Sequence, residues 1–190
     1  MGIVLTFLPW LIFWIILSYD KLFIAIAVAL AASVTTIVME RMAGRSAKVL
    51  QAGTFAVFVV FGLTAVLINH VWLHQWIRLL SAAALTFIVF VSILIGKPFT
   101  LQYARESVPK EFWNRPEFLR ANYIITWVWL AAFMINTAVT VLDRFIPSIN
   151  VVVNYVISIS PFIAATMFTT WYRTRGMKVL AIKQNGGFNP

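Results

Sequence analysis

The chain has 190 residues, of which 62% are apolar, and its mean hydropathy is +0.90. About half of the residues of a soluble globular domain are apolar, so this composition excludes that class and indicates helices in lipid. The formal net charge of +9 borders the apolar runs, which favours anionic lipid headgroups over nucleic acid as partners. Cysteine is absent, which excludes disulfides, thiolate metal ligands and cysteine nucleophiles.

Six stretches reach or approach the roughly 20 apolar residues that a helix needs to cross the hydrocarbon core. Because lipid offers the backbone no hydrogen-bond partners, each stretch is expected to be a helix. They cover about residues 3–19, 22–39, 49–69, 77–96, 121–142 and 148–172. The sequence therefore predicts an all-α, polytopic membrane protein, a six-transmembrane-helix bundle that forms one transmembrane domain over residues 1–190.

The first two stretches are expected to form an antiparallel hairpin, because only Asp20 and Lys21 separate them. Residues 1–17 lack the basic region and the cleavage site of a secretory signal, so they are interpreted as a retained span. The second stretch carries small residues at helical spacing, which let a neighbouring backbone approach closely. They are Ala25, Ala29, Ala32, Ser33 and Thr36, and residues 81–84 with the Ser92–Gly96 pair of the fourth stretch are expected to face them.

Two histidines lie at the outer end of the third stretch. His70 and His74 are four residues apart, so they share one face of a helix, and this spacing can hold a transition metal. Two histidines alone leave such a site short of ligands, and no Asp or Glu lies nearby in the sequence. We therefore expect them to be interfacial residues beside Trp72 and Trp76, with no metal bound.

Residues 97–120 form the only long polar segment, and they are expected to be a cytoplasmic connector at the membrane interface. Gly96 and Pro98 are expected to end the fourth helix, and residues 99–107 are interpreted as a short amphipathic segment at the surface. The candidate contact residues of the connector for lipids or partner proteins are basic or aromatic. They are Lys97, Tyr103, Arg105, Lys110, Trp113 and Arg115.

The fifth helix is expected to begin before its chain enters lipid, with Asn114 as its N-cap. The charges beside this helix start alternate in sign. We expect Arg115 and Arg120 to form screened surface pairs with Glu111 and Glu117, each contributing under about 1 kcal/mol.

The last two stretches carry polar residues on facing helices. They are Asn136, Thr140, Asn150, Asn154 and Ser158. Counting about 1.5 Å per residue from the outer ends puts Asn136 and Asn154 at a similar depth, so they can meet across an antiparallel pair. This cluster is either a polar pocket that opens to the outer side or interhelical hydrogen bonding that holds the helices together.

The basic residues alternate between the gaps, as the positive-inside rule predicts for a protein with both termini in the cytoplasm. The gaps placed in the cytoplasm hold Arg41, Arg45, Lys48, Lys97, Arg105, Lys110, Arg115, Arg120, Arg173, Arg175, Lys178 and Lys183. The outer gaps hold only Lys21, Arg78 and Arg144. Residues 173–190 are accordingly interpreted as a basic cytoplasmic tail.

No set of nucleophile, base and oxyanion donors is recognisable, and there is no Gly-rich phosphate loop. The apolar stretches are expected to contain no ionisable residue that serves a proton or ion pathway, and Asp20 and Asp143 are interpreted as solvated turn residues. The sequence therefore favours a protein that is not an enzyme and binds no cofactor and no metal.

Several short motifs occur in an order and spacing that resemble one family. They are Phe7-Leu8-Pro9, Tyr19-Asp20, Lys97-Pro98, Trp113, Asn122 with Asn136 fourteen residues later, Pro147 and Asn154. In these features the chain resembles the intracellular septation protein A (YciB-like) family of small bacterial inner-membrane proteins. The segment 99–105 and the stretch between Asn136 and Pro147 depart from that pattern.

The resemblance implies a role in maintaining the cell envelope during growth and division, through contacts with lipids or with envelope-synthesis and division proteins. It carries over no catalytic residue. Two other functions stay open from the residues themselves. One is a small carrier or channel for a neutral or lipid-like substrate, lined by Asn136, Asn154 and Ser158. The other is an accessory subunit of a larger membrane complex.

Overall fold

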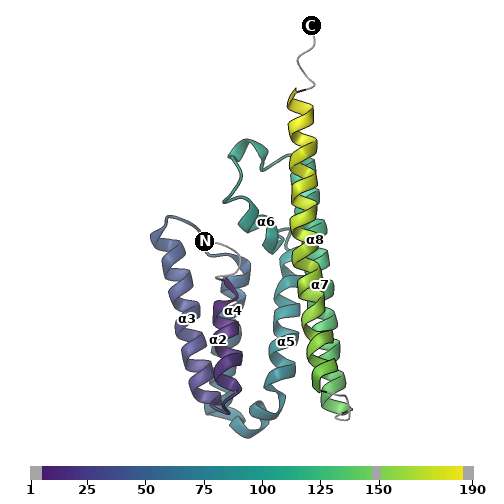
Figure 1. The fold of residues 1–190 in the computed structure, drawn as a ribbon. Helices are drawn as coiled ribbons and strands as arrows, with labels where there is room; N and C mark the ends of the chain where they lie inside the picture. Colours follow the sequence, from purple (N-terminus) through teal and green to yellow (C-terminus); the bar gives the residue numbers. More distant parts are fainter. Residues whose placement is uncertain (1–5, 147–150, 186–190) are drawn as a thin grey trace. The chain divides into compact units, whose positions relative to one another are not determined.

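The computed structural model describes the backbone of residues 6–146 and 151–185, and the side chains of residues 6–146 and 156–175. All regular structure within these ranges is helical, which confirms the all-α part of the predicted fold class (Figure 1). The chain divides into two units, Met1–Tyr103 and Ala104–Pro190.

The first unit is built from antiparallel helices joined by short connections. They are α2 (Leu8–Leu17), α3 (Leu22–Met42), α4 (Val49–Leu63), the π-helix η1 (Thr64–Asn69), α5 (His70–Leu94) and the short α6 (Phe99–Ala104). The core of this unit is aromatic: the ring centroid of Trp10 lies 4.8 Å from that of Phe58, and the ring centroid of Phe13 lies 5.2 Å from it. The Trp10 indole also donates a hydrogen bond of 2.8 Å to the hydroxyl of Thr54, which ties α2 to α4.

The small residues of α3 are mostly buried, as a close-packed face requires. The expectation that α5 faces them is wrong, because α3 packs chiefly against α2 and α4. Short connections make consecutive helices neighbours. On α5, Ser81 instead accepts a hydrogen bond of 3.4 Å from the indole of Trp14 on α2.

The helical run from Val49 to Leu94 reverses direction at Asn69, so it comprises two antiparallel helices (Figure 1). Asn69 has an extended backbone, and its side-chain oxygen accepts the backbone N–H of Trp72 at 2.9 Å, which caps α5. The fourth helix therefore begins at His70, seven residues before the predicted start. The two helices approach closely where Gly53 of α4 meets Ile88 of α5.

Two glycines with left-handed backbones end α3 and α5. Gly44 and Gly96 both have φ of +69°, and in each case the next N–H donates to a carbonyl five residues back, at 2.9 Å from Arg45 and 3.0 Å from Lys97. The predicted end of the fourth helix at Gly96 is confirmed. The predicted surface segment after it is wrong, because Phe99, Leu101 and Tyr103 of α6 are buried in the first unit.

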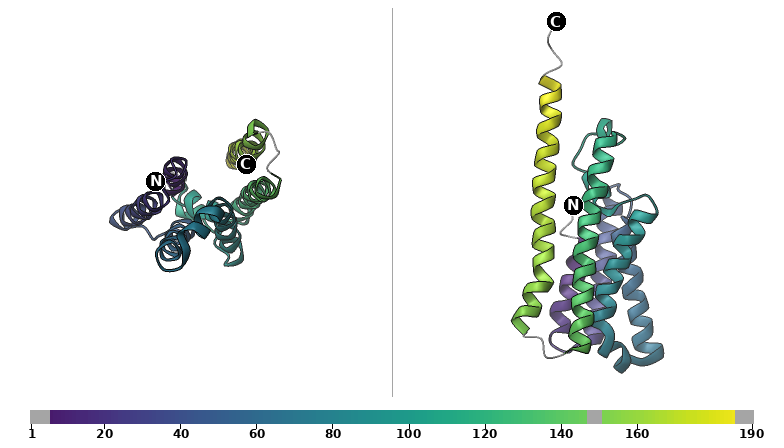
Figure 2. Two further views of the ribbon diagram at one scale, coloured as in Figure 1. Left: turned by 90° about the horizontal axis from the view of Figure 1, so that it is seen from below. Right: turned by 90° about the vertical axis from the view of Figure 1, so that its right-hand side faces the viewer.

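The second unit is a helical hairpin preceded by an irregular loop. Its elements are the 3-10 helix η2 (Lys110–Phe112), α7 (Pro116–Phe145) and α8 (Val151–Asn185), and the right-hand view of Figure 2 shows α7 and α8 side by side. The N-cap of α7 is Arg115 rather than Asn114. Proline lacks a backbone N–H and is best placed at the first helical position, so Pro116 fixes the start. The backbone of the predicted tail is helical as far as Asn185.

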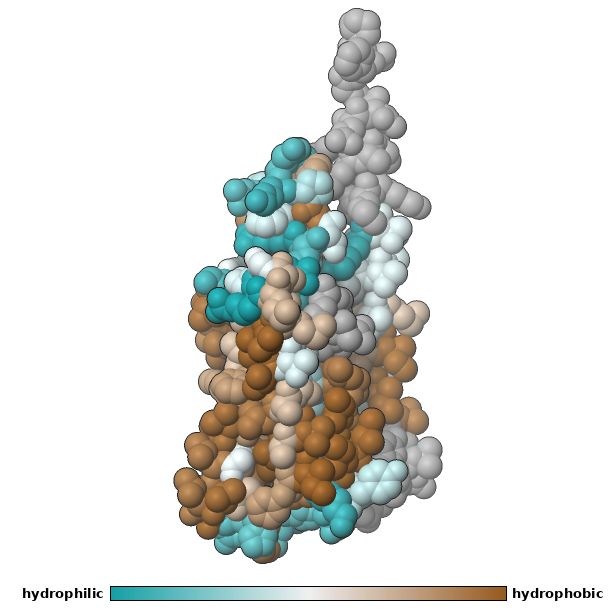
Figure 3. Space-filling model, turned by 90° about the vertical axis from the view of Figure 1, so that its left-hand side faces the viewer, coloured by the Kyte–Doolittle hydropathy of each residue, from teal (hydrophilic) through white to brown (hydrophobic). Residues whose placement is uncertain are grey.

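Three helical runs among the described residues are long and apolar enough to cross a membrane: Leu22–Met42, Val49–Leu94 and Pro116–Phe145. Most of the residues in these runs are not buried by the protein, which indicates that lipid covers their apolar side chains. On the face shown in Figure 3, apolar side chains cover the middle of the first unit and polar side chains gather at its ends. The chain is a membrane protein by this pattern.

Candidate functional sites

The last turn of α3 holds a carboxylate with no exposed surface. Glu40 Oε2 lies 2.7 Å from Arg45 Nε, and Glu40 Oε1 lies 3.0 Å from Lys48 Nζ. Lys48 is buried as well, while the side chain of Arg45 is 38% exposed. Glu40 lies just past the predicted limit of the second span at residue 39, because α3 continues to Met42, and the sequence analysis did not single it out.

The turn after α3 positions one of the two cations. The left-handed backbone of Gly44 folds the chain back, so that the N–H of Arg45 reaches the Glu40 carbonyl. That bond also sets the Arg45 side chain against the Glu40 carboxylate. The Glu40–Arg45 pair therefore follows from a common helix end, in which a glycine adopts the left-handed backbone conformation that is unfavourable for other residues.

Lys48 joins this ion cluster to α6 and to the start of α2. Its Nζ lies 4.9 Å from the centroid of the Tyr103 ring, and the Tyr103 hydroxyl donates a 2.6 Å hydrogen bond to the hydroxyl of Thr6. Next to it, Gln102 accepts the N–H of Val49 at 2.9 Å and so caps α4. Tyr103 is 6% exposed, which overturns its assignment as an exposed contact residue. An aromatic residue at the inward-facing position of α6 fills the end of the bundle.

The group Glu40, Arg45, Lys48, Tyr103 and Thr6, here called the Glu40 network, connects the ends of four elements. Buried charges are costly unless they are paired, and removing one partner leaves the other uncompensated. The arrangement therefore stabilises this end of the first unit.

The turn between α2 and α3 carries a contact between a carboxylate and a histidine. Asp20 Oδ1 lies 2.9 Å from His74 Nε2, and Asp20 has a left-handed backbone with φ of +62°. The Asp20 side chain is solvated, as expected, but it also joins the turn to α5. His70 lies instead beside Phe23, with ring centroids 5.7 Å apart. No group of three metal-ligating side chains occurs in the described part of the chain.

Residues 104–115 form a compact loop, here called the connector loop, that is held by its own side chains. The Trp113 indole donates to the Val108 carbonyl at 2.9 Å, and the guanidinium carbon of Arg105 lies 5.5 Å from the centroid of the Trp113 ring. The guanidinium carbon of Arg115 lies 4.5 Å from the centroid of the Phe112 ring. Two of its arginines therefore rest on aromatic faces.

The expected ion pairs of the connector are not formed. Within the side chains that the structure describes, neither Arg115 nor Arg120 lies in an ion pair with Glu111 or Glu117. The Arg115 guanidinium packs on a ring instead, which leaves its polar edge directed at solvent, since the residue is exposed. Lys110 is exposed at the tip of the loop, and Lys97 is exposed after α5 in the first unit.

A third arginine–aromatic pair lies on α8. The guanidinium carbon of Arg175 is 4.3 Å from the centroid of the Trp171 ring, and Trp171 is 49% exposed. The two residues are four apart, so they share a face of the helix, and the long arginine side chain reaches back along it. The sequence analysis named Arg175 only as a charge of the tail, although a tryptophan four residues before an arginine was the available signal.

The predicted polar cluster of the last two helices is only partly described. Asn136, Thr140 and Ser158 are half-buried, and the Thr140 hydroxyl donates to the Asn136 carbonyl of its own helix at 2.9 Å. Asn150 lies outside the described residues, and so does the side chain of Asn154. The choice between a pocket and packing stays a prediction for this cluster.

Comparison with known proteins gives no further assignment, because no family model, curated protein or solved structure matches the chain. The resemblance to the YciB-like family therefore depends on the sequence motifs alone.

Proposed function

We propose that the protein is a multi-pass protein of the bacterial inner membrane that supports cell-envelope maintenance and septation without catalysing a reaction. It acts through contacts with lipids and membrane proteins. In this proposal six helices cross the membrane, and both termini and the connector loop face the cytoplasm. The three long apolar runs support membrane insertion, and the alternation of basic residues supports the orientation.

One observation carries the proposal: the exposed Arg115 and the half-buried Arg105 of the connector loop rest on aromatic rings and not on carboxylates. An arginine on a ring loses little further freedom when an anionic group binds its edge, and arginine and tryptophan are frequent at the centres of protein interfaces. The loop is also held in one shape by its own hydrogen bonds, which lowers the entropic cost of binding.

The experiment is purification of the full-length chain from bacterial membranes in a mild detergent, with its associated membrane proteins quantified. The variant Arg105→Ala/Arg115→Ala is expected to retain the fold and to lose most of a stoichiometric partner, together with its ability to support normal septation. The matched control is Lys21→Ala/Arg78→Ala, which removes two exposed cations that the proposed topology assigns to the outer side. Equal recovery of partners with both variants would refute the contact role.

Copurification in a fixed ratio with a complex of several subunits would instead favour the accessory-subunit function. In that case the same double variant would lower the amount of the assembled complex, and isolated loss of septation would not be seen.

A further inference from the structure

The inference concerns where the protein meets lipid headgroups, and it rests on the proposed topology. We infer that the Trp171–Arg175 pair of α8 forms a binding site for the phosphate of an anionic phospholipid in the cytoplasmic leaflet, and that Arg173 adds positive charge at the same level of the helix. The connector loop, in which Arg115 is exposed, is left for protein contacts.

The alignment of α7 with α8 in the hairpin determines where the Trp171–Arg175 pair lies along the length of α7. Trp129 of α7 donates a hydrogen bond of 3.1 Å to Thr169 of α8, and the ring centroids of Phe133 and Phe162 lie 5.1 Å apart. Because the helices are antiparallel, Trp171 lies within about one turn of Tyr123. Aromatic residues of both helices therefore share one level.

That level has the position of a membrane boundary. From Tyr123 to Asp143 the chain of α7 rises about 30 Å at 1.5 Å per residue, which is the thickness of the hydrocarbon core. Tryptophan and tyrosine concentrate at this boundary in membrane proteins. Arg173 and Arg175 are exposed and follow Trp171 directly, so their guanidinium groups lie in the headgroup layer.

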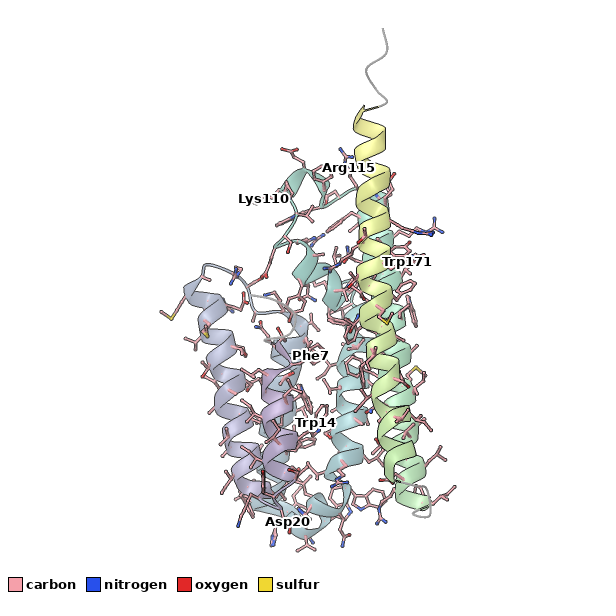
Figure 4. All side chains as sticks on the ribbon, viewed as in Figure 1. Phe7, Trp14, Asp20, Lys110, Arg115 and Trp171 are labelled. Atoms are coloured by element: carbon pink, nitrogen blue, oxygen red, sulfur yellow. The ribbon has the colours of Figure 1, made fainter. Side chains whose placement is uncertain are left out.

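The connector loop lies further out. Arg115 precedes Tyr123 by eight residues, which corresponds to about 12 Å along the hairpin, whereas the headgroup layer adds roughly 5–7 Å on each side. Figure 4 shows Arg115 and Lys110 beyond Trp171 along the hairpin, in the direction of the end of α8. Arg115 therefore lies beyond the headgroup layer, which makes it a poorer partner for a lipid phosphate than Arg175.

The local net charge also favours the end of α8 over the connector loop as the site of lipid binding. Residues 172–190 contain Arg173, Arg175, Lys178 and Lys183 and no Asp or Glu. The connector loop has three cations, Arg105, Lys110 and Arg115, but also two carboxylates, Glu106 and Glu111. An anionic headgroup is therefore attracted more strongly to residues 172–190 than to the connector loop, where the two carboxylates repel it.

The pair itself is suited to a phosphate. The indole of Trp171 anchors the helix at the boundary, and it holds the Arg175 guanidinium in place by a cation–π contact. The planar guanidinium can then offer two parallel N–H groups to the phosphate oxygens. Arg173 lies on the other side of α8, so it adds to the positive charge of the headgroup layer without touching the same phosphate.

The test is native mass spectrometry of the full-length protein in detergent, titrated with phosphatidylglycerol, phosphatidylcholine or inorganic phosphate. We expect preferential retention of phosphatidylglycerol and none of inorganic phosphate. Arg173→Gln/Arg175→Gln is expected to weaken that retention about tenfold, because each basic residue near an anionic surface adds to the attraction between the protein and the lipid. Trp171→Leu is expected to weaken it by a smaller factor. Arg105→Gln/Arg115→Gln is the control and should leave it unchanged.

Equal retention of the two lipids, or loss caused by Arg105→Gln/Arg115→Gln and not by Arg173→Gln/Arg175→Gln, would overturn the inference. Retention of inorganic phosphate would show a free anion site and would also overturn it. These outcomes differ from a failure of the proposed function, which is measured by partner recovery and septation. A circular dichroism spectrum and a melting temperature equal to the parent chain show that each variant has folded.

Discussion

The carboxylate of Glu40 lies 3.0 Å from the ammonium group of Lys48, and neither side chain is accessible to solvent beyond a few per cent. Arg45 approaches the same carboxylate from the turn that ends α3. One buried anion therefore compensates two cations. The stability of this end of the first unit depends on all three charges being present together.

Glu40→Gln leaves the buried Lys48 and the partly exposed Arg45 without a full counter-charge. We expect a loss of about 3 kcal/mol in stability, in line with the breaking of other buried pairs. The measurement is the melting temperature of the purified protein in detergent. Glu111→Gln is the matched control, because Glu111 is exposed and forms no ion pair within the described side chains. A shift of equal size in both variants would contradict the assignment.

The coupling between Glu40 and Lys48 is measured separately by a double-mutant cycle. The combined variant Glu40→Gln/Lys48→Gln is expected to be more stable than the sum of the two single changes implies, because the second change removes the charge that the first left uncompensated. Additive effects would show that the 3.0 Å contact contributes nothing beyond packing.

The contact between α4 and α5 leaves no room for a side chain at Gly53. A Cβ atom there would lie 2.8 Å from both Cγ atoms of Ile88, which belong to a branched and buried side chain. Gly53→Ala is therefore expected to separate the helices and to lower stability by about 1–3 kcal/mol, as overpacking does. Gly62→Ala on the same helix is the control, because its Cβ would meet Ile26 at an ordinary 3.7 Å.

The two alanine variants are compared by melting temperature and by resistance to proteolysis in detergent. Alanine favours a helix over glycine, so Gly62→Ala is expected to be neutral or stabilising. A neutral Gly53→Ala would mean that α4 and α5 are further apart than the Ile88 contact implies.

The hydrogen bond from Tyr103 to Thr6 joins residues that are 97 positions apart. Tyr103→Phe retains the ring beneath Lys48 and removes only the hydroxyl, so a loss of about 1 kcal/mol is expected. Tyr19→Phe is the control, because the Tyr19 side chain is 73% exposed. Limited proteolysis near Thr6 checks the local effect, since the N-terminal end of α2 loses its tie to α6. Unchanged cleavage in Tyr103→Phe would contradict the role of this bond.

The local features of the fold were predictable from the sequence, and the tertiary contacts were not. Apolar length predicts the helices, and Gly96 marks a helix end because a left-handed residue is needed there. Glu40 was missed because the predicted boundary followed hydropathy, which drops one turn before α3 ends. Tyr103 was placed at the surface because nothing in its neighbourhood indicates a hydroxyl partner as distant as Thr6.

The candidate contact residues were likewise only partly predictable from the sequence. The aromatic and basic composition of residues 105–115 identified the connector loop, since that signal is local. The pairing of Arg115 with Phe112 instead of Glu111 depends on the shape of the loop around η2. The position of Trp171 along α7 depends on how α7 and α8 align in the hairpin. The sequence of either helix alone does not determine that alignment.

The absence of cysteine allows the proposed topology to be tested with single introduced thiols. Lys21→Cys and Lys110→Cys replace exposed residues at the α2–α3 turn and at the tip of the connector loop. In intact cells a membrane-impermeant maleimide is expected to label Lys21→Cys and to spare Lys110→Cys, because only the first faces the outside when the basic loops are cytoplasmic. Both variants are expected to react after the membrane is opened with detergent, which shows that each thiol is accessible. Labelling of Lys110→Cys in intact cells would reverse the orientation, and the lipid site on α8 would then face the outer leaflet.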